Sequence, residues 1–222
     1  ITEEDIANFL TNTPGFFERH AEVLASVQIT SPHGQRAVSL QERQAEMLRE
    51  KIKGLEHRIM DMVRNSNDNT AIATKVHQWT SALLRVKDPF DLPEAVVSGI
   101  RTLFDVPQAA VRVWTVAGPY IDADFTQGAS EDARAFASSL TMPFCGPNLG
   151  FEPAGWLAQE AGEPAQSLAL LPLREGAIDS ATPAFGLLVL GSPDPQRFDA
   201  TMGTEFLSRI AELASAALVR LK

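Results

Sequence analysis

The sequence contains a single cysteine, Cys145, among its 222 residues, so no disulfide can form within the chain. One cysteine also excludes metal sites built from several thiolates, and it is typical of a reducing compartment. We therefore expect a cytoplasmic protein, and the acidic first residues do not resemble a secretory signal. A run of about 20 apolar residues is absent too, because prolines and glycines interrupt the longest uncharged stretch, residues 135–151. We expect no membrane-spanning helix.

Positive charge is scarce. Nineteen lysines and arginines stand against 28 aspartates and glutamates, which leaves a net charge of −9 at pH 7. Only residues 34–64 carry more bases than acids, seven against five. A protein that binds nucleic acid needs several clustered cations to displace counterions from the phosphates. We therefore expect no nucleic-acid partner.

Motifs for metal binding and catalysis are missing as well. The four histidines, His20, His33, His57 and His77, are not spaced three or four residues apart, so they do not indicate a metal site. The G-x-S-x-G elbow of hydrolases, the P-loop and the glycine pattern of dinucleotide-binding proteins are also absent. The sequence thus predicts no catalytic residue, no metal and no identifiable cofactor.

Two helices are predicted before residue 31. Thr2 and Asp5 have the spacing of a capping box at the start of the first helix. Thr13-Pro14 has the form of an N-cap followed by proline at the first position of a second helix. The Ser-Pro-His-Gly sequence at residues 31–34 then breaks the helical pattern. We interpret residues 1–38 as an N-terminal helical hairpin.

A long helix with a narrow apolar stripe is predicted for residues 39–87. It opens with a second capping box, formed by Ser39 and Glu42. Apolar residues then repeat at alternating steps of four and three: Leu48, Ile52, Leu55, Ile59 and Met62. This spacing is typical of a coiled-coil seam, and it predicts a dimer interface with a second copy of the chain. The alternative is that the stripe packs against the N-terminal hairpin.

The course of this helix beyond residue 64 is open. The same register continues to the seam positions Ser66 and Asn69, which lie within the polar run at residues 65–69. This run either ends the helix or inserts a polar layer that sets the register of the seam.

Helices and strands are mixed after residue 88. The predicted elements are a helix capped by Asp91, a strand at 110–116, a helix at 130–140 that begins at Ser130, strands at 167–173 and 185–191, and a helix at 201–221. The last two strands are nearly continuous apolar runs, typical of the centre of a sheet. Gly186 and Gly191 flank the final strand and predict close backbone approach there. This order predicts an α+β domain, residues 88–222, with an antiparallel sheet flanked by helices.

Short motifs along the whole chain carry a family resemblance. They are Phe9-Leu10, Pro14-Gly15-Phe16-Phe17, Pro32-His33-Gly34, AVSLQERQ at residues 37–44, Leu48-Arg49, Cys145-Gly146, LLPL at residues 170–173, Gly191-Ser192 with Asp194, and Arg197-Phe198. Together they resemble the bacterial domain of unknown function 484 (DUF484) family. The C-terminal half of that family is similar to GAF domains, which are small-molecule and dimerisation modules of bacterial signalling proteins. The resemblance implies a GAF-like fold after a helical extension, and it supplies no ligand, partner or catalytic residue.

The resemblance also implies a class of role. We expect a dimeric sensory or scaffold module without catalytic activity. The sequence contains no kinase, cyclase or DNA-binding helix-turn-helix, so a sensor of this kind requires a separate protein partner for its output. The alternative is a protein-interaction adaptor that has a filled core and binds no small molecule.

The candidate ligand-binding residues lie in the C-terminal half. The connection at residues 119–166 is expected to cover the sheet, and its aromatic side chains are expected to line an apolar cavity. The candidates are Trp114, Phe125, Phe136, Phe144 and Trp156, together with Cys145. Charges are scarce at residues 135–151, which predicts an uncharged small-molecule ligand. The alternative is that the aromatic residues only pack the core.

Cys145 lies in the sequence Phe-Cys-Gly-Pro, which predicts a loop where a thiol could face a pocket. A thiol nucleophile needs a cation or a helix N-terminus that lowers its pKa, and no base stands beside Cys145 in the sequence. A free cysteine is otherwise a small buried hydrophobic residue. A structural role is therefore favoured, and a small redox enzyme that uses Cys145 remains as an alternative.

Overall fold

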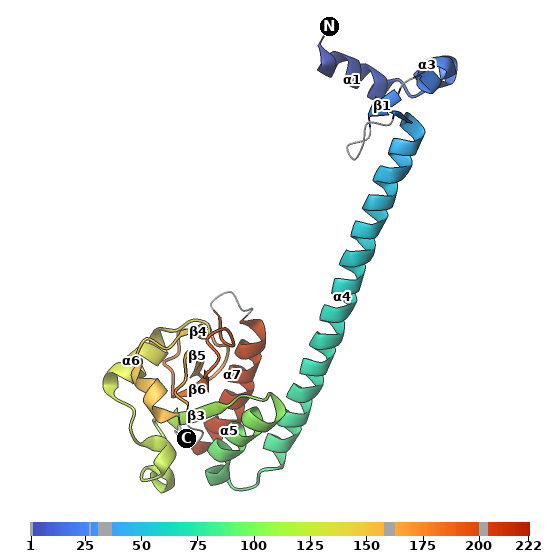
Figure 1. Ribbon diagram of the computed structural model, residues 1–222. Helices are drawn as coiled ribbons and strands as arrows, with labels where there is room; N and C mark the ends of the chain where they lie inside the picture. Colours follow the sequence, from blue (N-terminus) through green and yellow to red (C-terminus); the bar gives the residue numbers. More distant parts are fainter. Residues whose placement is uncertain (1, 27, 31–36, 158–162, 200–203) are drawn as a thin grey trace. The chain divides into compact units, whose positions relative to one another are not determined.

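The computed structural model describes residues 2–26, 28–30, 37–157, 163–199 and 204–222 (Figure 1), without the side chains of residues 24–42. The chain divides into two compact units, Ile1–Asn69 and Thr70–Lys222. The long helix α4 (Leu40–Arg85) begins in the first unit and ends in the second. None of the helices in the described ranges is both long enough and apolar enough to cross a membrane.

The first helix, α1 (Glu3–Asn12), begins with the predicted capping box. The N–H of Asp5 donates to Oγ1 of Thr2 at 3.2 Å, and the N–H of Thr2 donates to Oδ2 of Asp5 at 2.7 Å. The backbone hydrogen bond from Thr2, and then the side-chain bond, lower the pKa of Asp5 because they stabilise its carboxylate. The prediction of a capped first helix is confirmed.

The prediction of one continuous second helix is wrong. The structure has two short helices instead, α2 (Gly15–Arg19) and α3 (Ala21–Ser26). His20 leaves the helical region between them, with φ −126° and ψ 47°, and its ring centroid lies 4.8 Å from that of Phe16. The N–H of His20 donates to the carbonyl of Phe16 at 3.0 Å, which closes the first of the two helices. The N-cap of α2 is Pro14 and not the predicted Thr13, whose carbonyl accepts the N–H of Phe16 at 2.9 Å.

A two-stranded antiparallel ribbon, which the sequence did not predict, precedes α4. Its strands are β1 (Gln28–Thr30) and β2 (Ala37–Ser39). The predicted break at residues 31–34 lies outside the described residues. The helix α4 then runs without interruption to Arg85, so the polar run at residues 65–69 does not end it.

The second unit is built on four antiparallel strands. They are β3 (Gln108–Val113), β4 (Phe144–Pro147), β5 (Ser167–Leu173) and β6 (Gly186–Ser192). Their order in the sheet is β3-β6-β5-β4, and every residue of the central strands β5 and β6 is buried. The prediction that the two apolar runs form central strands is confirmed.

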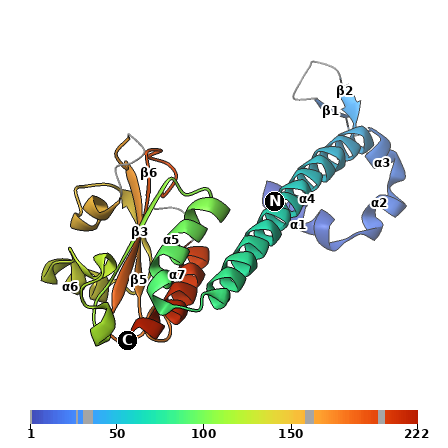
Figure 2. The same ribbon diagram turned by 90° about the horizontal axis from the view of Figure 1, so that it is seen from below.

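Helices cover both faces of this sheet, as Figure 2 shows. The helices α5 (Leu92–Leu103) and α7 (Glu205–Leu218) pack on one face, and α6 (Glu131–Ser139) packs on the other. Side chains alternate along β3, with Val111 in the core on the α5–α7 face and Ala110 in the core on the α6 face. The predicted α+β class is confirmed. Short 3-10 helices complete the unit: η1 (Pro89–Asp91), η2 (Gly118–Tyr120), η3 (Asp124–Thr126), η4 (Glu152–Trp156) and η6 (Val219–Leu221).

Several predicted boundaries in this unit differ from the structure. The strand predicted at residues 110–116 ends before Thr115, because this residue adopts a left-handed φ of 64°. Asp91 precedes α5 but makes no side-chain cap, whereas the carboxylate of Asp88 accepts the N–H of Phe90 at 2.9 Å and caps η1.

Of the other two predicted helix starts, the structure confirms one and does not describe the other. Ser130 caps α6 as predicted, since its Oγ accepts the N–H of Ala133 at 3.1 Å. The final helix is described from Glu205 to Leu218, and η6 follows it to Leu221. Its predicted start at residue 201 lies outside the described residues.

The end of α4 packs against α5 through a glycine. Trp79 is fully buried, and a Cβ at Gly99 would lie only 2.4 Å from its Cδ1. Only glycine leaves room for the indole ring at this approach. Leu83, one turn further along α4, is buried in the same core. This part of α4 is therefore an integral helix of the second unit.

A buried arginine holds together segments at one end of the sheet. The guanidinium of Arg174, a residue only 3% exposed, donates to the carbonyls of Ser138 at 2.6 Å and Leu140 at 2.8 Å, where α6 ends. It also donates to the carbonyl of Ser180 at 3.2 Å, and its backbone N–H donates to Oγ of Ser215 at 3.0 Å. Among the described residues no carboxylate pairs with it. Carbonyls at the negative end of α6 compensate its charge instead.

We expect Arg174→Met to lower the free energy of unfolding by about 3 kcal/mol or more, because it leaves several buried carbonyls without a donor. Arg174→Lys should recover only part of this loss, since an ammonium group lacks the planar fork that spans two segments. Urea unfolding followed by circular dichroism measures both effects. Arg209→Met, at an exposed position of α7, is the control and should change stability by less than about 0.5 kcal/mol. Equal losses in the Arg174→Met and control variants would contradict this role.

Candidate functional site

The sheet separates the six residues that the sequence predicts as ligand-binding. Four belong to the core on the α6 face or pack against it: Trp114, Phe136, Phe144 and Trp156. The other two, Phe125 and Cys145, belong to the opposite core or pack against it. The structure therefore does not gather the six residues around one cavity, because neighbouring residues of a strand point to opposite faces. Their role in ligand binding stays a prediction.

The two tryptophans of this set use their ring N–H groups within the fold. Nε1 of Trp114 donates to the carbonyl of Ala184 at 2.7 Å, and Nε1 of Trp156 donates to the carbonyl of Gly128 at 2.9 Å. Trp114 is 7% exposed, and Trp156 is partly buried. The environment of Trp114 is that of a packed core residue, whereas Trp156 keeps an accessible surface.

Cys145 lies in a strand, so its prediction as a loop residue is wrong. It belongs to β4, opposite Ala169 of β5, and an edge strand tolerates the glycine and proline that follow it. Its side chain is buried, and burial raises the pKa of the thiol to about 11. The thiol is therefore protonated at neutral pH, which weakens the redox alternative.

A pocket of about 490 Å³ lies where β3 starts and where the connection between β4 and β5 passes over it. Most of the lining residues that the structure describes are apolar or glycine, and Glu163 is the one acid among these. None of the six predicted residues lines it. The lining consists of Gln108, Asn148, Gly150, Phe151, Ala154, Gly155, Leu157, Glu163, Pro164 and Ala165.

The η4 segment of this lining is held against α6. The N–H of Ser130, the N-cap residue of α6, donates to Oε1 of Glu152 at 3.0 Å, and its hydroxyl donates to Oε2. The hydroxyl hydrogen bond is the larger cause that lowers the pKa of Glu152, and the backbone bond adds to it. The ring of Phe151, just before η4, packs 5.9 Å from that of Phe136 and 5.3 Å from that of Phe144. These contacts fix one wall of the pocket.

Gly191 of β6 lies directly beside the pocket wall. It pairs with Gln108 across the sheet, and a Cβ at this position would lie 3.1 Å from Oε1 of Gln108. The same Cβ would lie 2.5 Å from Cδ1 of Leu157. Its distance to Cβ of Ala165 would be 3.0 Å, so a side chain at residue 191 would crowd three lining residues. The predicted close backbone approach is found at Gly186, where a Cβ would lie 2.8 Å from the carbonyl oxygen of Arg112, whereas side chains make the close approach at Gly191.

Two side-chain amides, of Gln108 and Asn148, stand among the polar groups of this pocket. Nε2 of Gln108 donates to the carbonyl of Glu163 at 2.9 Å. This bond identifies the amide nitrogen, so Oε1 is an acceptor, and it is buried without a partner in the described part of the chain. Nδ2 of Asn148 donates to the carbonyl of Ala165 at 2.9 Å, and Oδ1 accepts the N–H of Gly150 at 3.0 Å. Gln108 thus carries the unused acceptor.

A second pocket, of about 370 Å³, lies along β3, at the edge of the sheet. Two of the predicted residues, Phe125 and Trp156, line it together with Arg112. The guanidinium carbon of Arg112 lies 5.9 Å from the ring centroid of Trp156, and Nη1 donates to the carbonyl of Val111 at 3.1 Å. Burial lowers the pKa of Arg112, and the carboxylate of Asp124 opposes this shift. This pocket is charged, whereas the first is nearly uncharged.

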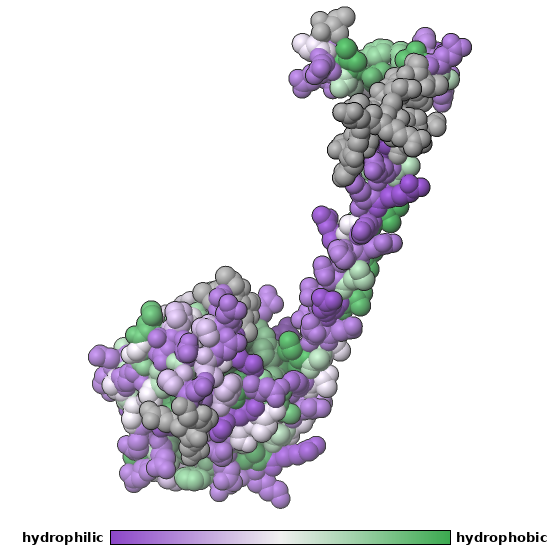
Figure 3. Space-filling model, viewed as in Figure 1, coloured by the Kyte–Doolittle hydropathy of each residue, from purple (hydrophilic) through white to green (hydrophobic). Residues whose placement is uncertain are grey.

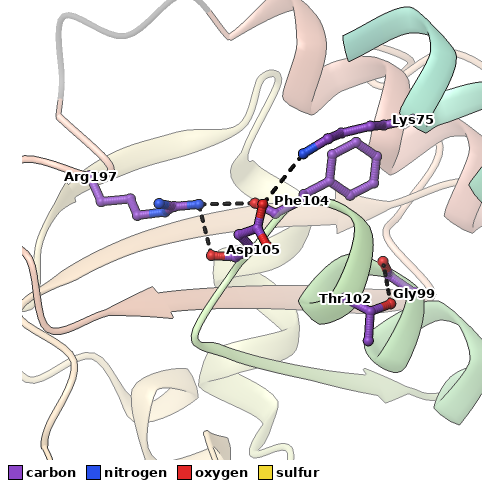
Figure 4. Close-up of polar contacts among 6 residues, drawn as sticks. All are labelled: Lys75, Gly99, Thr102, Phe104, Asp105 and Arg197. Atoms are coloured by element: carbon purple, nitrogen blue, oxygen red, sulfur yellow. Dashed lines mark hydrogen bonds and ion pairs between the residues drawn. The ribbon is translucent and has the colours of Figure 1, made fainter. Parts of the chain in front are cut away.

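Polar contacts around Asp105 join three segments near the start of β3 (Figure 4). Nη2 of Arg197, in the connection between β6 and α7, donates to the carbonyls of Phe104 at 3.0 Å and Asp105 at 2.9 Å. Nζ of Lys75 on α4 lies 3.4 Å from Oδ2 of Asp105. Asp105 has a φ of 55°, a left-handed conformation that aspartate adopts more readily than most residues. Gln108 follows three residues later, so these contacts adjoin the pocket wall.

Sequence reasoning missed Gln108 and Asn148. A glutamine at the start of a strand is ordinary, so no local pattern marked it. Asn148 followed by Gly150 has the spacing of an Asx turn, which signals a turn and not a pocket. The two residues meet only through the pairing of β3 with β6 and of β4 with β5, which brings distant segments together.

We expect the thiol of the folded protein to react slowly with iodoacetamide at pH 8, because burial holds it protonated and covered. Cys145→Ala should retain the fold. The wild-type free energy of unfolding should fall relative to that of Cys145→Ala as the pH rises from about 8.5 to about 11, since the thiol ionises first in the unfolded chain. Mass spectrometry of labelled protein and urea unfolding at several pH values measure these effects. Rapid labelling at pH 6 would overturn the structural role.

The chain is similar to two GAF domains of known structure. One is the GAF domain of a provisionally assigned sensor histidine kinase from Pseudomonas syringae pv. tomato, with 16% identity, a TM-score of 0.44, and coverage of 71% of this chain and 91% of that chain. The other is the nlh2 GAF domain of A. aeolicus in an inactive state, with 11% identity, a TM-score of 0.45, and coverage of 69% and 99%. No curated protein matches the sequence. The family model described as "Protein of unknown function, DUF484" matches residues 1–222, and the chain therefore belongs to the DUF484 family.

Proposed function

We propose that this protein is a dimeric sensory module without catalytic activity, which binds a small uncharged molecule in the pocket beside Gln108. The observation that carries the proposal is a pocket of about 490 Å³ with a buried, unused amide acceptor in its wall. Small-molecule sites commonly enclose roughly 300–1,000 Å³, with mostly apolar walls and few polar groups. The lining of this pocket has that composition.

The polar groups favour a ligand that donates a hydrogen bond. Leaving a buried acceptor such as Oε1 of Gln108 without a donor costs about 1–3 kcal/mol, and an N–H or O–H of a ligand would remove this cost after a small shift of the amide. Phe151 and Leu157 offer apolar contacts. The described residues that line the pocket include no lysine or arginine, so they offer a phosphate-bearing ligand no counter-charge.

The contacts at Asp105 support a route from the pocket to α4. Gln108 and Asp105 stand at the two ends of one short segment, and Lys75 of α4 lies against Asp105. A shift of Gln108 on binding would displace this segment and change the contacts of α4. In this proposal the output then passes to a separate protein partner.

The dimer is supported by the exposed seam of α4. The seam residues Leu48, Ile52, Leu55, Ile59 and Met62 are 47–70% exposed within one chain. Figure 3 shows hydrophobic residues along α4 among hydrophilic ones. A second copy would bury them, and each fully buried leucine, isoleucine or methionine contributes about 1.5–3 kcal/mol. The described part of the N-terminal helices leaves these side chains exposed, which supports pairing with a second copy over packing against the N-terminal hairpin.

A protein-interaction adaptor without a ligand is the second candidate. It is supported by the two filled cores, in which the side chains of both central strands are fully or almost fully buried. In this case the pocket beside Gln108 holds only water, and the surface of the protein carries its function.

We expect native mass spectrometry of the protein, purified from its own host, to show one retained small molecule per chain. Gly155→Phe should abolish this retention, because residue 155 lines the pocket and its Cβ position has open space around it. Gly118→Phe is the matched control, since Gly118 also has open space and lies outside the pocket. Gln108→Leu should reduce the retained fraction by about tenfold, because it removes the acceptor.

Two results would contradict the sensor proposal and favour the protein-interaction adaptor. The first is a wild-type protein that retains no small molecule. The second is a retained molecule that survives both Gly155→Phe and Gln108→Leu, which would place it elsewhere in the protein.

We expect the chain to be a dimer at micromolar concentration by sedimentation equilibrium. The double variant Ile52→Asp, Ile59→Asp should be monomeric, because buried carboxylates in the seam are not paired. Residues 70–222 should stay folded in it, with an unchanged near-ultraviolet signal from their tryptophans. The control pair His57→Asp, Arg64→Asp, on the opposite side of α4, should stay dimeric. A monomeric wild-type protein would show that the seam has no partner of its own kind.

A further inference from the structure

We propose that α4 pairs with α4 of a second copy in a parallel, in-register, two-stranded coiled coil. This inference rests on the proposed dimer and goes beyond it, because it specifies the direction and the register of the two helices. The partner of the α4 seam is a second copy of this chain. Three features of α4 support this inference: the order of the seam residues, the charges beside the seam, and the polar residues at the end of the seam.

The order of the seam residues favours two parallel strands. In the heptad notation abcdefg, a step of three leads from a to d, so Ile52 and Ile59 are a residues, while Leu48, Leu55 and Met62 are d residues. Among parallel coiled coils, isoleucine at a with leucine at d favours two strands over three or four, because side chains enter the two kinds of layer with different geometry. All five side chains are at least 47% exposed and free to form these layers.

The charges beside the seam favour the same direction. In a parallel pair, a g residue of one helix faces the e residue five positions later in the partner. Lys51 is a g residue and Glu56 is the e residue five positions later, so this contact forms twice in the dimer. In an antiparallel pair, g residues face each other and e residues face each other. That arrangement sets Lys51 against Arg58, although it places Arg49 beside Glu56. Only the parallel pair has an attractive contact and no repulsive one.

The seam ends in polar residues within an unbroken helix. Ser66 and Asn69 occupy the next a and d positions, and both are exposed. Polar residues in a seam weaken pairing and disfavour shifted registers, since a shift would set them against apolar layers. Beyond them, the seam position Leu83 is buried in the core of its own chain. Pairing is thus confined to residues 45–62, and the two copies of residues 70–222 follow the same end of the paired segment.

Disulfide cross-linking of the full chain tests direction and register. Cys145 is the only cysteine, so Cys145→Ser provides the background. Leu48→Cys and Met62→Cys are added to it separately, and non-reducing gels after mild oxidation give the linked fraction. In the parallel, in-register pair both variants should link to themselves, because equal residues meet in each layer. Glu50→Cys and Arg64→Cys, on the opposite side of the helix, are the controls and should stay unlinked.

Other outcomes separate the two proposals. A wild-type monomer in sedimentation equilibrium overturns the dimer and this inference with it. A stable dimer in which neither Leu48→Cys nor Met62→Cys links overturns only the parallel register. An antiparallel seam would instead link Leu48→Cys with Ile59→Cys when the two proteins are mixed and allowed to exchange.

Charge reversal gives an independent readout of direction. Lys51→Glu should raise the dissociation constant of the dimer roughly threefold to tenfold, because it sets a carboxylate at position 51 against Glu56 in both pairs. The double variant Lys51→Glu, Glu56→Lys should restore the wild-type value. An antiparallel seam predicts the opposite sign for the single variant, since the new carboxylate would face Arg58. A tighter dimer in Lys51→Glu would therefore overturn the parallel arrangement.

Discussion

The second unit depends on one constraint: the central strands β5 and β6 are buried along their whole length. Such a sheet needs cover on both faces, and the helices α5 and α7 supply one cover. The other consists of α6 and the segment that returns from β4 to β5. This returning segment passes over the start of β3, and the pocket lies where the two meet. The candidate site is therefore a product of how the sheet is covered.

Small residues and buried donors determine how closely the covering segments approach. Gly99 lets α5 contact the indole of Trp79, and Gly191 lets Leu157 and Gln108 lie over β6. Arg174 fastens the end of α6 through carbonyls that would otherwise lack donors. In the wall of the pocket, Oε1 of Gln108 is a buried acceptor without a partner in the described part of the chain.

The helix α4 uses one apolar repeat for two kinds of contact. At residues 48–62 the seam is exposed and suits a second chain, whereas Leu83 in the same register is buried within its own chain. Polar residues at 65–69 separate the two stretches without ending the helix. A single continuous helix therefore contains both the proposed dimer seam and Lys75, which lies against Asp105 near the pocket. This continuity supports a role in transmission.

Local patterns in the sequence determined the types of the longer elements of this protein. The capping box at Thr2, the exposed seam of α4 and the two buried central strands all follow from residues within a few positions of one another. The tertiary structure alone decided that Cys145 joins an edge strand and that the predicted aromatic residues divide between two cores. The pocket also depends on the tertiary structure alone, because Gln108 contacts Glu163, 55 residues later in the chain, only when the strands of the sheet are paired. The spacing of residues in the sequence indicates on which face of a helix or strand a side chain lies. A site depends in addition on which distant segments come together at that face.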